Sequence, residues 1–126
     1  MAGIEKAQPP WGETAPKAQV VNNSGDLLYQ VNVGDVVFTE HLSDCGSGCS
    51  TGFIDVVEGT NDIVVYQSET SIGESLGSVG QFQKSNNYAV NIRNVDGYCA
   101  ELWQRFDTSG TFNDDTTRVL IDTGCP

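Results

Sequence analysis

The chain has 126 residues and a formal net charge of -11 at pH 7, a length that fits one domain with a two-sheet core and leaves no room for a second. Its six lysines and arginines are scattered along the sequence, so a phosphate backbone would be repelled at most approaches and nucleic acid is not expected as a partner. No run approaches the roughly 20 apolar residues of a membrane-spanning helix, so membrane insertion is not expected either.

The N-terminal stretch, residues 1–17, holds three of the four prolines and shows no alternation of apolar and polar residues. Proline cannot donate a backbone hydrogen bond to a sheet ladder. This stretch is therefore predicted to be an extended arm or tether outside the sheets. Ile4 and Trp11 are its candidate partner-binding residues, because such an arm can pack on its own domain or on a neighbour.

Residues 18–126 are predicted to form a single antiparallel β-sandwich of about eight or nine strands, immunoglobulin-like or transthyretin-like. Short apolar runs recur between glycine, asparagine and aspartate turns, and no helical periodicity appears, so the fold class is all-β. The predicted strands cover residues 18–22, 27–33, 36–42, 52–57, 62–68, 79–84, 88–94, 99–106 and 116–122.

Three hairpins are predicted within this series, with turns at Gly34-Asp35, at residues 58–61 and at residues 94–97. A period of two along each strand assigns the inward-facing side chains. Trp103 and Phe106 fall on opposite faces of one strand, so one of them is expected at the surface, and Trp103 is a third candidate for partner binding. The predicted inward positions are Leu27, Tyr29, Val31, Val33, Phe38, Phe53, Val64, Tyr66, Val90, Ile92, Leu102 and Leu120.

Four cysteines in a small chain rich in glycine and serine predict an oxidising compartment and two disulfides. The three-residue spacer between Cys45 and Cys49 can close a tight ring, which leaves Cys99 to pair with Cys125. The second bridge closes a longer loop and is worth roughly 3 kcal/mol in the chain-entropy model. Four reduced thiols in a cytosolic protein, or thiolates that bind a metal, are the alternatives.

A group of potential metal ligands surrounds the first two cysteines. Glu40, His41 and Asp44 lie close to Cys45 and Cys49 in the sequence, and these residue types bind zinc or copper. A second histidine and a recognised ligand spacing are both missing, so we expect no metal and no cofactor. If the chain binds a small ligand or a metal, the loops at residues 40–50 and 69–77 are the predicted places.

Two short motifs resemble catalytic signatures. Residues 73–77 match the Gly-x-Ser-x-Gly pattern of hydrolases, which requires a following helix and a later histidine as base, but the single histidine, His41, comes earlier. Residues 119–124 end in Asp-Thr-Gly, as in aspartic proteases, which require a second aspartate and a large β domain after the motif. No catalytic residue is predicted, and a hydrolase is the least favoured alternative.

A family resemblance rests on three segments. Residues 30–35 read Gln-Val-Asn-Val-Gly-Asp, residues 53–66 hold two β-branched runs around Glu-Gly-Thr-Asn, and residues 87–92 read Asn-Tyr-Ala-Val-Asn-Ile. This order resembles the DUF4397-like family of bacterial envelope β-sandwich domains, and other transthyretin-like or immunoglobulin-like sandwiches share the pattern. The resemblance implies an exported, non-enzymatic module at the cell surface and assigns no functional residues.

The leading functional expectation is thus an exported, non-enzymatic β-sandwich, extracellular or in the cell envelope of a microbe, with a structural or binding role. It is expected to self-assemble or to bind a protein partner, and the choice between a small-molecule and a carbohydrate ligand is left open. The runner-up is a small ligand- or metal-binding protein. No signal peptide is recognised after Met1, as expected for a mature domain expressed with a new start codon.

Overall fold

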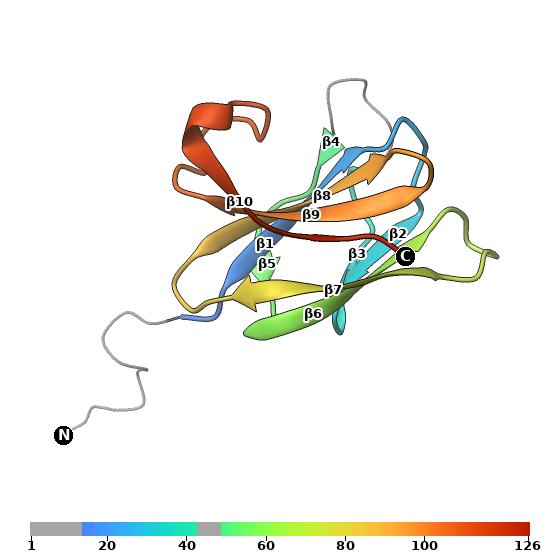
Figure 1. Cartoon of the computed structure of the whole chain (residues 1–126), viewed down its shortest axis with the longest axis horizontal. Coiled ribbons are helices and arrows are strands. Elements are labelled where there is room, and N and C mark those ends of the chain that lie inside the picture. The colour runs from blue at the N-terminus through green and yellow to red at the C-terminus, as the bar shows by residue number, and fades with distance from the viewer. Residues whose placement is uncertain (1–13, 43–48) are drawn as a thin grey trace.

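The computed structural model describes residues 14–42 and 49–126 (Figure 1). These residues form an all-β structure, and none of their helices is long and apolar enough to cross a membrane. A short 3-10 helix, η2 (Asp115–Thr117), precedes the last strand. The strands are β1 (Lys17–Asn23), β2 (Gln30–Val33), β3 (Val36–Phe38), β4 (Cys49–Ser50), β5 (Ile54–Asp55), β6 (Gly59–Tyr66), β7 (Glu74–Phe82), β8 (Asn87–Asn94), β9 (Tyr98–Arg105) and β10 (Arg118–Gly124).

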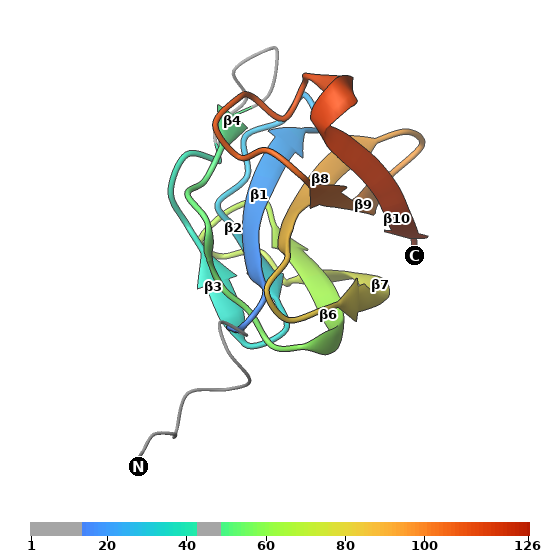
Figure 2. The same cartoon turned by 90° about the vertical axis from the view of Figure 1, so that its left-hand side faces the viewer.

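Two sheets pack face to face, which confirms the predicted sandwich (Figure 2). The larger sheet has the order β10-β9-β8-β1-β4, with β5 also paired to β1, and the smaller sheet has the order β3-β2-β6-β7. One part of the prediction is wrong, because β1 and β8 run parallel rather than antiparallel. These two strands are far apart in the sequence, so no tight turn fixes their relative direction.

Two of the three predicted hairpins are confirmed. β2 and β3 pair across Gly34-Asp35, where Gly34 adopts a φ of 61°, a value that glycine reaches without the steric cost of a side chain. β8 and β9 pair across residues 95–97. The third hairpin is wrong, because β5 pairs with β1 in the larger sheet whereas β6 joins the smaller sheet. Residues 56–58 therefore cross between the sheets.

The core lies between the sheets, and the predicted alternation is only partly right. Val31, Val33, Phe38, Val90, Ile92 and Leu102 are buried as predicted. In β6 the phase is wrong, because Ile63 and Val65 are buried whereas Val64 and Tyr66 are half-exposed. The continuous run Ile63-Val64-Val65 offers no polar residue to set the phase. Leu27, Tyr29 and Leu120 are exposed instead of inward, and Phe53 is half-buried.

Strands β1 and β8 are buried on both faces, which the predicted alternation did not foresee. Beyond the main core, Val21, Ala89 and Phe112 form a second small apolar cluster, with Trp103 packed against it. Phe112 belongs to residues 107–114, here called the covering loop. This loop lies over the face of the larger sheet that points away from the smaller sheet, here called the outer face.

The last strand closes one side of the sandwich, where it runs between β9 and β7 (Figure 1). Its pairing with β9 shifts register between Leu120 and Asp122, a bulge of the kind that redirects a strand. Asp122 then accepts a hydrogen bond from the backbone N–H of Gly80 in β7, at 3.0 Å. A Cβ on Gly124 would lie 2.8 Å from the Leu76 carbonyl oxygen, so only glycine allows this close approach.

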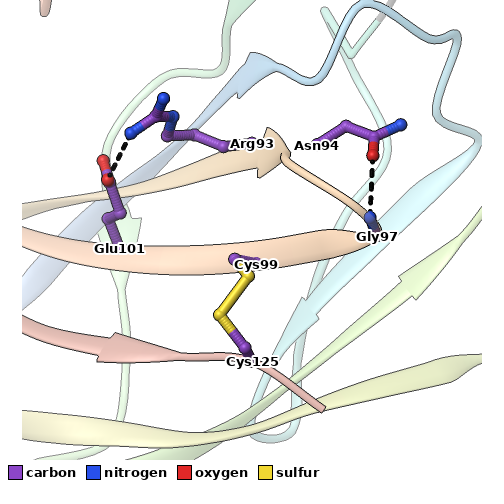
Figure 3. Close-up of a disulfide and its surroundings, with 6 residues drawn as sticks. All are labelled: Arg93, Asn94, Gly97, Cys99, Glu101 and Cys125. Atoms are coloured by element: carbon purple, nitrogen blue, oxygen red, sulfur yellow. Dashed lines mark hydrogen bonds and ion pairs between the residues drawn. A yellow bond between two sulfur atoms is a disulfide. The ribbon is translucent and has the colours of Figure 1, made fainter.

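A disulfide joins Cys99, in β9, to Cys125, which follows β10, as predicted (Figure 3). Their Cα atoms are 4.5 Å apart. Cys49 is also disulfide-bonded, whereas Cys45, its predicted partner, lies outside the described residues. The C-terminal strand is therefore fastened covalently to the start of β9.

The described part of the predicted arm is hydrogen-bonded to the sandwich. Thr14 accepts a bond from the backbone N–H of Ser85, Pro16 accepts one from Val56, and Lys17 begins β1. Ile4 and Trp11 lie outside the described residues.

Candidate functional site

The chain has three arginines, Arg93, Arg105 and Arg118, and the fold brings all three to the outer face. They come from β8, β9 and β10. Arg105 and Arg118 are direct partners in the β9–β10 register. Like charges directly opposite one another destabilise a sheet unless other groups compensate them. In a chain of net charge -11, this local positive charge marks the outer face as the candidate site.

A row of polar side chains crosses three strands on this face. Asn23 of β1 donates to the side-chain oxygen of Asn91 of β8 at 2.7 Å, and Asn91 donates to Glu101 of β9 at 3.0 Å. Glu101 also accepts a bond from the Trp103 indole N–H at 2.9 Å and one from Arg93 at 3.1 Å (Figure 3). The Glu101 carboxylate is thus held in one orientation by three donors.

The guanidinium of Arg118 sits in the corner between two aromatic rings. Its Cζ atom lies 4.1 Å from the centre of the Trp103 ring and 4.2 Å from that of Phe112. The two rings meet edge to face, with centroids 5.9 Å apart. Cation–π contacts of this kind stabilise the charge without neutralising it. Among the described side chains, no carboxylate forms an ion pair with Arg118, and its buried Nε finds no hydrogen-bond acceptor.

Arg105 fastens the covering loop to the sheet. The residue is 3% exposed, and its guanidinium donates to the Gln19 side-chain oxygen at 2.7 Å. It also donates to the carbonyl oxygens of Asp107 and Gly110, at 2.9 and 3.0 Å. Burial lowers the pKa of Arg105 below its ordinary value. The negative charges of Asp107 and Asp114 oppose this shift, whereas the positive charge of Arg118 adds to it. The guanidinium remains charged, since arginine does not deprotonate in proteins.

Phe112 lines two hollows on the outer face. The first, here called the Arg118 hollow, has a volume of about 350 Å³, and the second, the Arg105 hollow, about 270 Å³. The Arg118 hollow is lined by Asn23, Asn91, Arg93, Glu101, Trp103, Phe112, Asn113 and Arg118. The Arg105 hollow is lined by Gln19, Val21, Ser50, Phe53, Arg105, Thr108, Gly110, Thr111, Phe112 and Asn113.

The predicted metal candidates do not come together in the described residues. Glu40 and His41 are both exposed, and Asp44 lies outside the described residues together with Cys45. No three histidine, cysteine, aspartate or glutamate side chains of the described ranges are placed to hold a metal ion. The residue 69–77 segment is not a loop throughout, because β7 already begins at Glu74.

The two motifs that resemble catalytic signatures, at residues 73–77 and 119–124, make contacts that support the fold. Ser75 lies in β7 and donates to the Asp62 carboxylate at 2.9 Å, so it stands on a strand and not on the strand-to-helix turn of a hydrolase. Asp122 accepts bonds from the backbone N–H groups of Gly80 and Thr123. Its carboxylate ties β10 to the smaller sheet.

Trp103 is the one predicted site residue that the described structure places at the candidate site. Its neighbours were missed because they come from five segments of the sequence, and only the sheet register brings them together. The available signal was the outward phase shared by Asn91, Glu101 and Trp103 on two paired strands.

The fold and the site together define a disulfide-containing β-sandwich with a polar, arginine-rich hollow on its larger sheet. Comparison of the chain with protein-family models, with curated proteins and with solved structures found no match.

Acid should weaken the polar row. Burial by itself raises the pKa of Glu101, but its hydrogen bonds from Asn91, Trp103 and Arg93 and the charge of Arg93 outweigh burial, so its pKa lies below the ordinary 4.5. A carboxyl group whose pKa is lower in the folded state stabilises the fold at pH values above its unfolded-state pKa. This stabilisation is lost as the pH falls through the folded-state pKa. In urea titrations between about pH 6 and pH 3, Glu101→Gln should therefore lose less stability than the wild type.

Glu58→Gln, at an exposed 4.0 Å ion pair, is the control for this acid titration and should follow the wild type. If the unfolding free energies of both variants fell equally with pH, the expectation would be contradicted.

Proposed function

We propose that this chain is an exported, non-enzymatic β-sandwich module of a microbial surface that binds a saccharide on the outer face of its larger sheet. The observation that carries the proposal is the Arg118 hollow, where amide, carboxylate and guanidinium groups gather around one recess. The disulfide between Cys99 and Cys125 supports export, because such bonds persist in oxidising compartments.

The size and chemistry of the Arg118 hollow favour a hydroxyl-rich ligand. Its volume of about 350 Å³ is near the lower end for ligand sites, roughly 300–1,000 Å³, and suits a single sugar ring. Side-chain amides donate to and accept from hydroxyl groups, and carboxylates accept from them. Trp103 and Phe112 are engaged with Arg118, which leaves little apolar surface for an apolar ligand.

A panel of immobilised oligosaccharides, neutral and acidic, tests this proposal with the full chain. The wild type should bind members of the panel, and Asn23→Ala, which removes an amide from the hollow, should weaken that binding about tenfold, the loss of one good hydrogen bond to a ligand. Asn32→Ala is the matched control, because Asn32 is a half-buried asparagine with one side-chain hydrogen bond on the smaller sheet. Absence of binding to every saccharide, or equal losses in both variants, would refute the proposed site.

A further inference from the structure

We infer that the Arg118 hollow selects a sugar that carries a single carboxylate, a uronic acid, and that the Arg118 guanidinium binds that carboxylate. This inference rests on the proposed function and names the chemical class of its ligand. Three observations support it: no described carboxylate pairs with Arg118, Glu101 already accepts three hydrogen bonds, and the whole chain carries a strong negative charge.

Arg118 is an uncompensated cation with unused donors. The two rings hold its guanidinium in place, yet its Nε is buried without an acceptor, and no described carboxylate pairs with it. A buried donor without an acceptor is rare and calls for an explanation. Because the Nε itself is buried, an arriving carboxylate would meet the terminal Nη groups of the guanidinium, whose planar arrangement matches the two oxygens of a carboxylate.

The described negative groups near Arg118 already accept hydrogen bonds. Glu101 accepts three hydrogen bonds, one of them from Arg93. Asp107 accepts both bonds of Ser109, and Asp114 accepts both bonds of Thr116 in its own turn. Among the described residues that line the hollow, two are arginines and one is a glutamate, so these residues together carry a net positive charge.

The rest of the ligand has to be small, polar and otherwise uncharged. A polyanion would be repelled by the net charge of -11, and a doubly charged phosphate would be repelled more than a carboxylate. Asn23 and Asn91 stand beside Arg118 in the hollow, and each uses only one amide hydrogen within the polar row. The remaining amide hydrogens suit ring hydroxyls, which gives a carboxylate joined to a polyol.

NMR titration of the uniformly 15N-labelled full chain with D-glucuronate, D-glucose, acetate and inorganic phosphate tests the inference. Glucuronate should bind at least tenfold more tightly than each of the other three, and should shift the Arg118 Nε–Hε and Trp103 Nε1–H signals. Raising NaCl from 50 to 500 mM should weaken glucuronate binding severalfold, because an ion pair is screened.

Two variants assign the preference to Arg118. Arg118→Met should bring glucuronate down to the affinity of glucose, whereas Lys17→Met, which removes a cation that is 47% exposed in its side chain and does not line the hollow, should retain the preference. The wild-type comparison needs no variant, so a poorly folded Arg118→Met does not remove the test.

Each contrary result has its own meaning. Equal binding of glucose and glucuronate would overturn the uronate inference and leave the saccharide proposal standing. Acetate or phosphate binding as tightly as glucuronate would overturn the role of the sugar ring. Binding of none of the four probes, together with a blank oligosaccharide panel, would refute both proposals.

Discussion

Replacing Cys99 and Cys125 together with serine should lower the free energy of unfolding by about 3 kcal/mol, the value for closing a loop of this length in the unfolded chain. The two residues are 26 positions apart. For a chain of this size, that corresponds to a drop in Tm of roughly 10 °C. The loss should appear mainly in β10, because the bridge fastens its end to β9. Chemical denaturation of both proteins in urea measures the difference.

Hydrogen exchange provides the local readout for this disulfide. Amides of Leu120 and Thr123 should exchange faster in the serine variant, whereas those in the centre of β8 should keep their protection relative to global unfolding. Ser109→Ala is a control for surface substitution and should change stability little. An unchanged unfolding free energy in the double serine variant would show that the interactions of β10 with β9 and β7 suffice without the bridge.

Replacing Arg105 with methionine should cost about 3 kcal/mol, because it removes the buried hydrogen bonds that attach the covering loop to the sheet. Methionine has a similar stem, so the change tests the guanidinium more than the packing. Gln19 and the carbonyl oxygens of Asp107 and Gly110 lose their donor. The loop should then detach, and Phe112 should lose contact with Trp103.

Arg93→Met is the matched control for Arg105. The Arg93 side chain is 51% exposed and makes one ion pair at 3.1 Å, a kind worth about 0–1 kcal/mol. Urea unfolding measures both variants, and Trp103 fluorescence in a Trp11→Phe background reports the loop. If the Arg105 and Arg93 variants lose the same small amount of stability, Arg105 does not fasten the loop.

The two predictions bear on the site in different ways. The disulfide holds β10, which carries Arg118, and Arg105 holds the loop that carries Phe112. Both supports keep the guanidinium between its two rings. Weakening either one should therefore loosen the Arg118 hollow as well as lower the stability, and the glucuronate titration can measure that effect.

Local signals in the sequence were enough for the all-β class, for parts of most strands and for two hairpins, but they missed β4 and the first half of β7. The turn at Gly34 and the turn before Tyr98 join strands that are adjacent in sequence, so a glycine that tolerates positive φ determines their pairing. The same reasoning failed at Gly59, where the chain has just crossed between the sheets over residues 56–58 and β6 begins. Turn chemistry does not say which sheet the next strand will join.

Of the two motifs that resemble catalytic signatures, one has the predicted secondary structure and the other does not. The Asp-Thr-Gly at residues 122–124 does end the last strand, as expected. The sequence predicts a loop at Ser75, but this residue belongs to β7, because its strand pairing with Val64 of β6 outweighs the weak local preference of a glycine-rich segment.

The candidate site depended most on long-range pairing. Trp103 was a candidate from the sequence, since the predicted strand over residues 99–106 places it on the face opposite Phe106; in the structure β9 ends at Arg105 and Phe106 is exposed. Nothing local connects Asn23 with Arg118, because they lie at opposite ends of the chain. The parallel insertion of β1 beside β8 and the addition of β10 beside β9 bring them to one face.

The sequence by itself determined the all-β class, the approximate place of most strands, two of the three hairpin turns and the pairing of Cys99 with Cys125. Alternation and glycine conformation act over short distances, and the short spacer between Cys45 and Cys49 left Cys99 to pair with Cys125. Only the tertiary structure decided the parallel position of β1, the burial of Val21 and Ala89 on the outer face, and the gathering of the three arginines. The order of strands in a sheet, and which loop covers a sheet face, depend on contacts between segments far apart in the chain. A local sequence pattern does not contain the energies of these contacts.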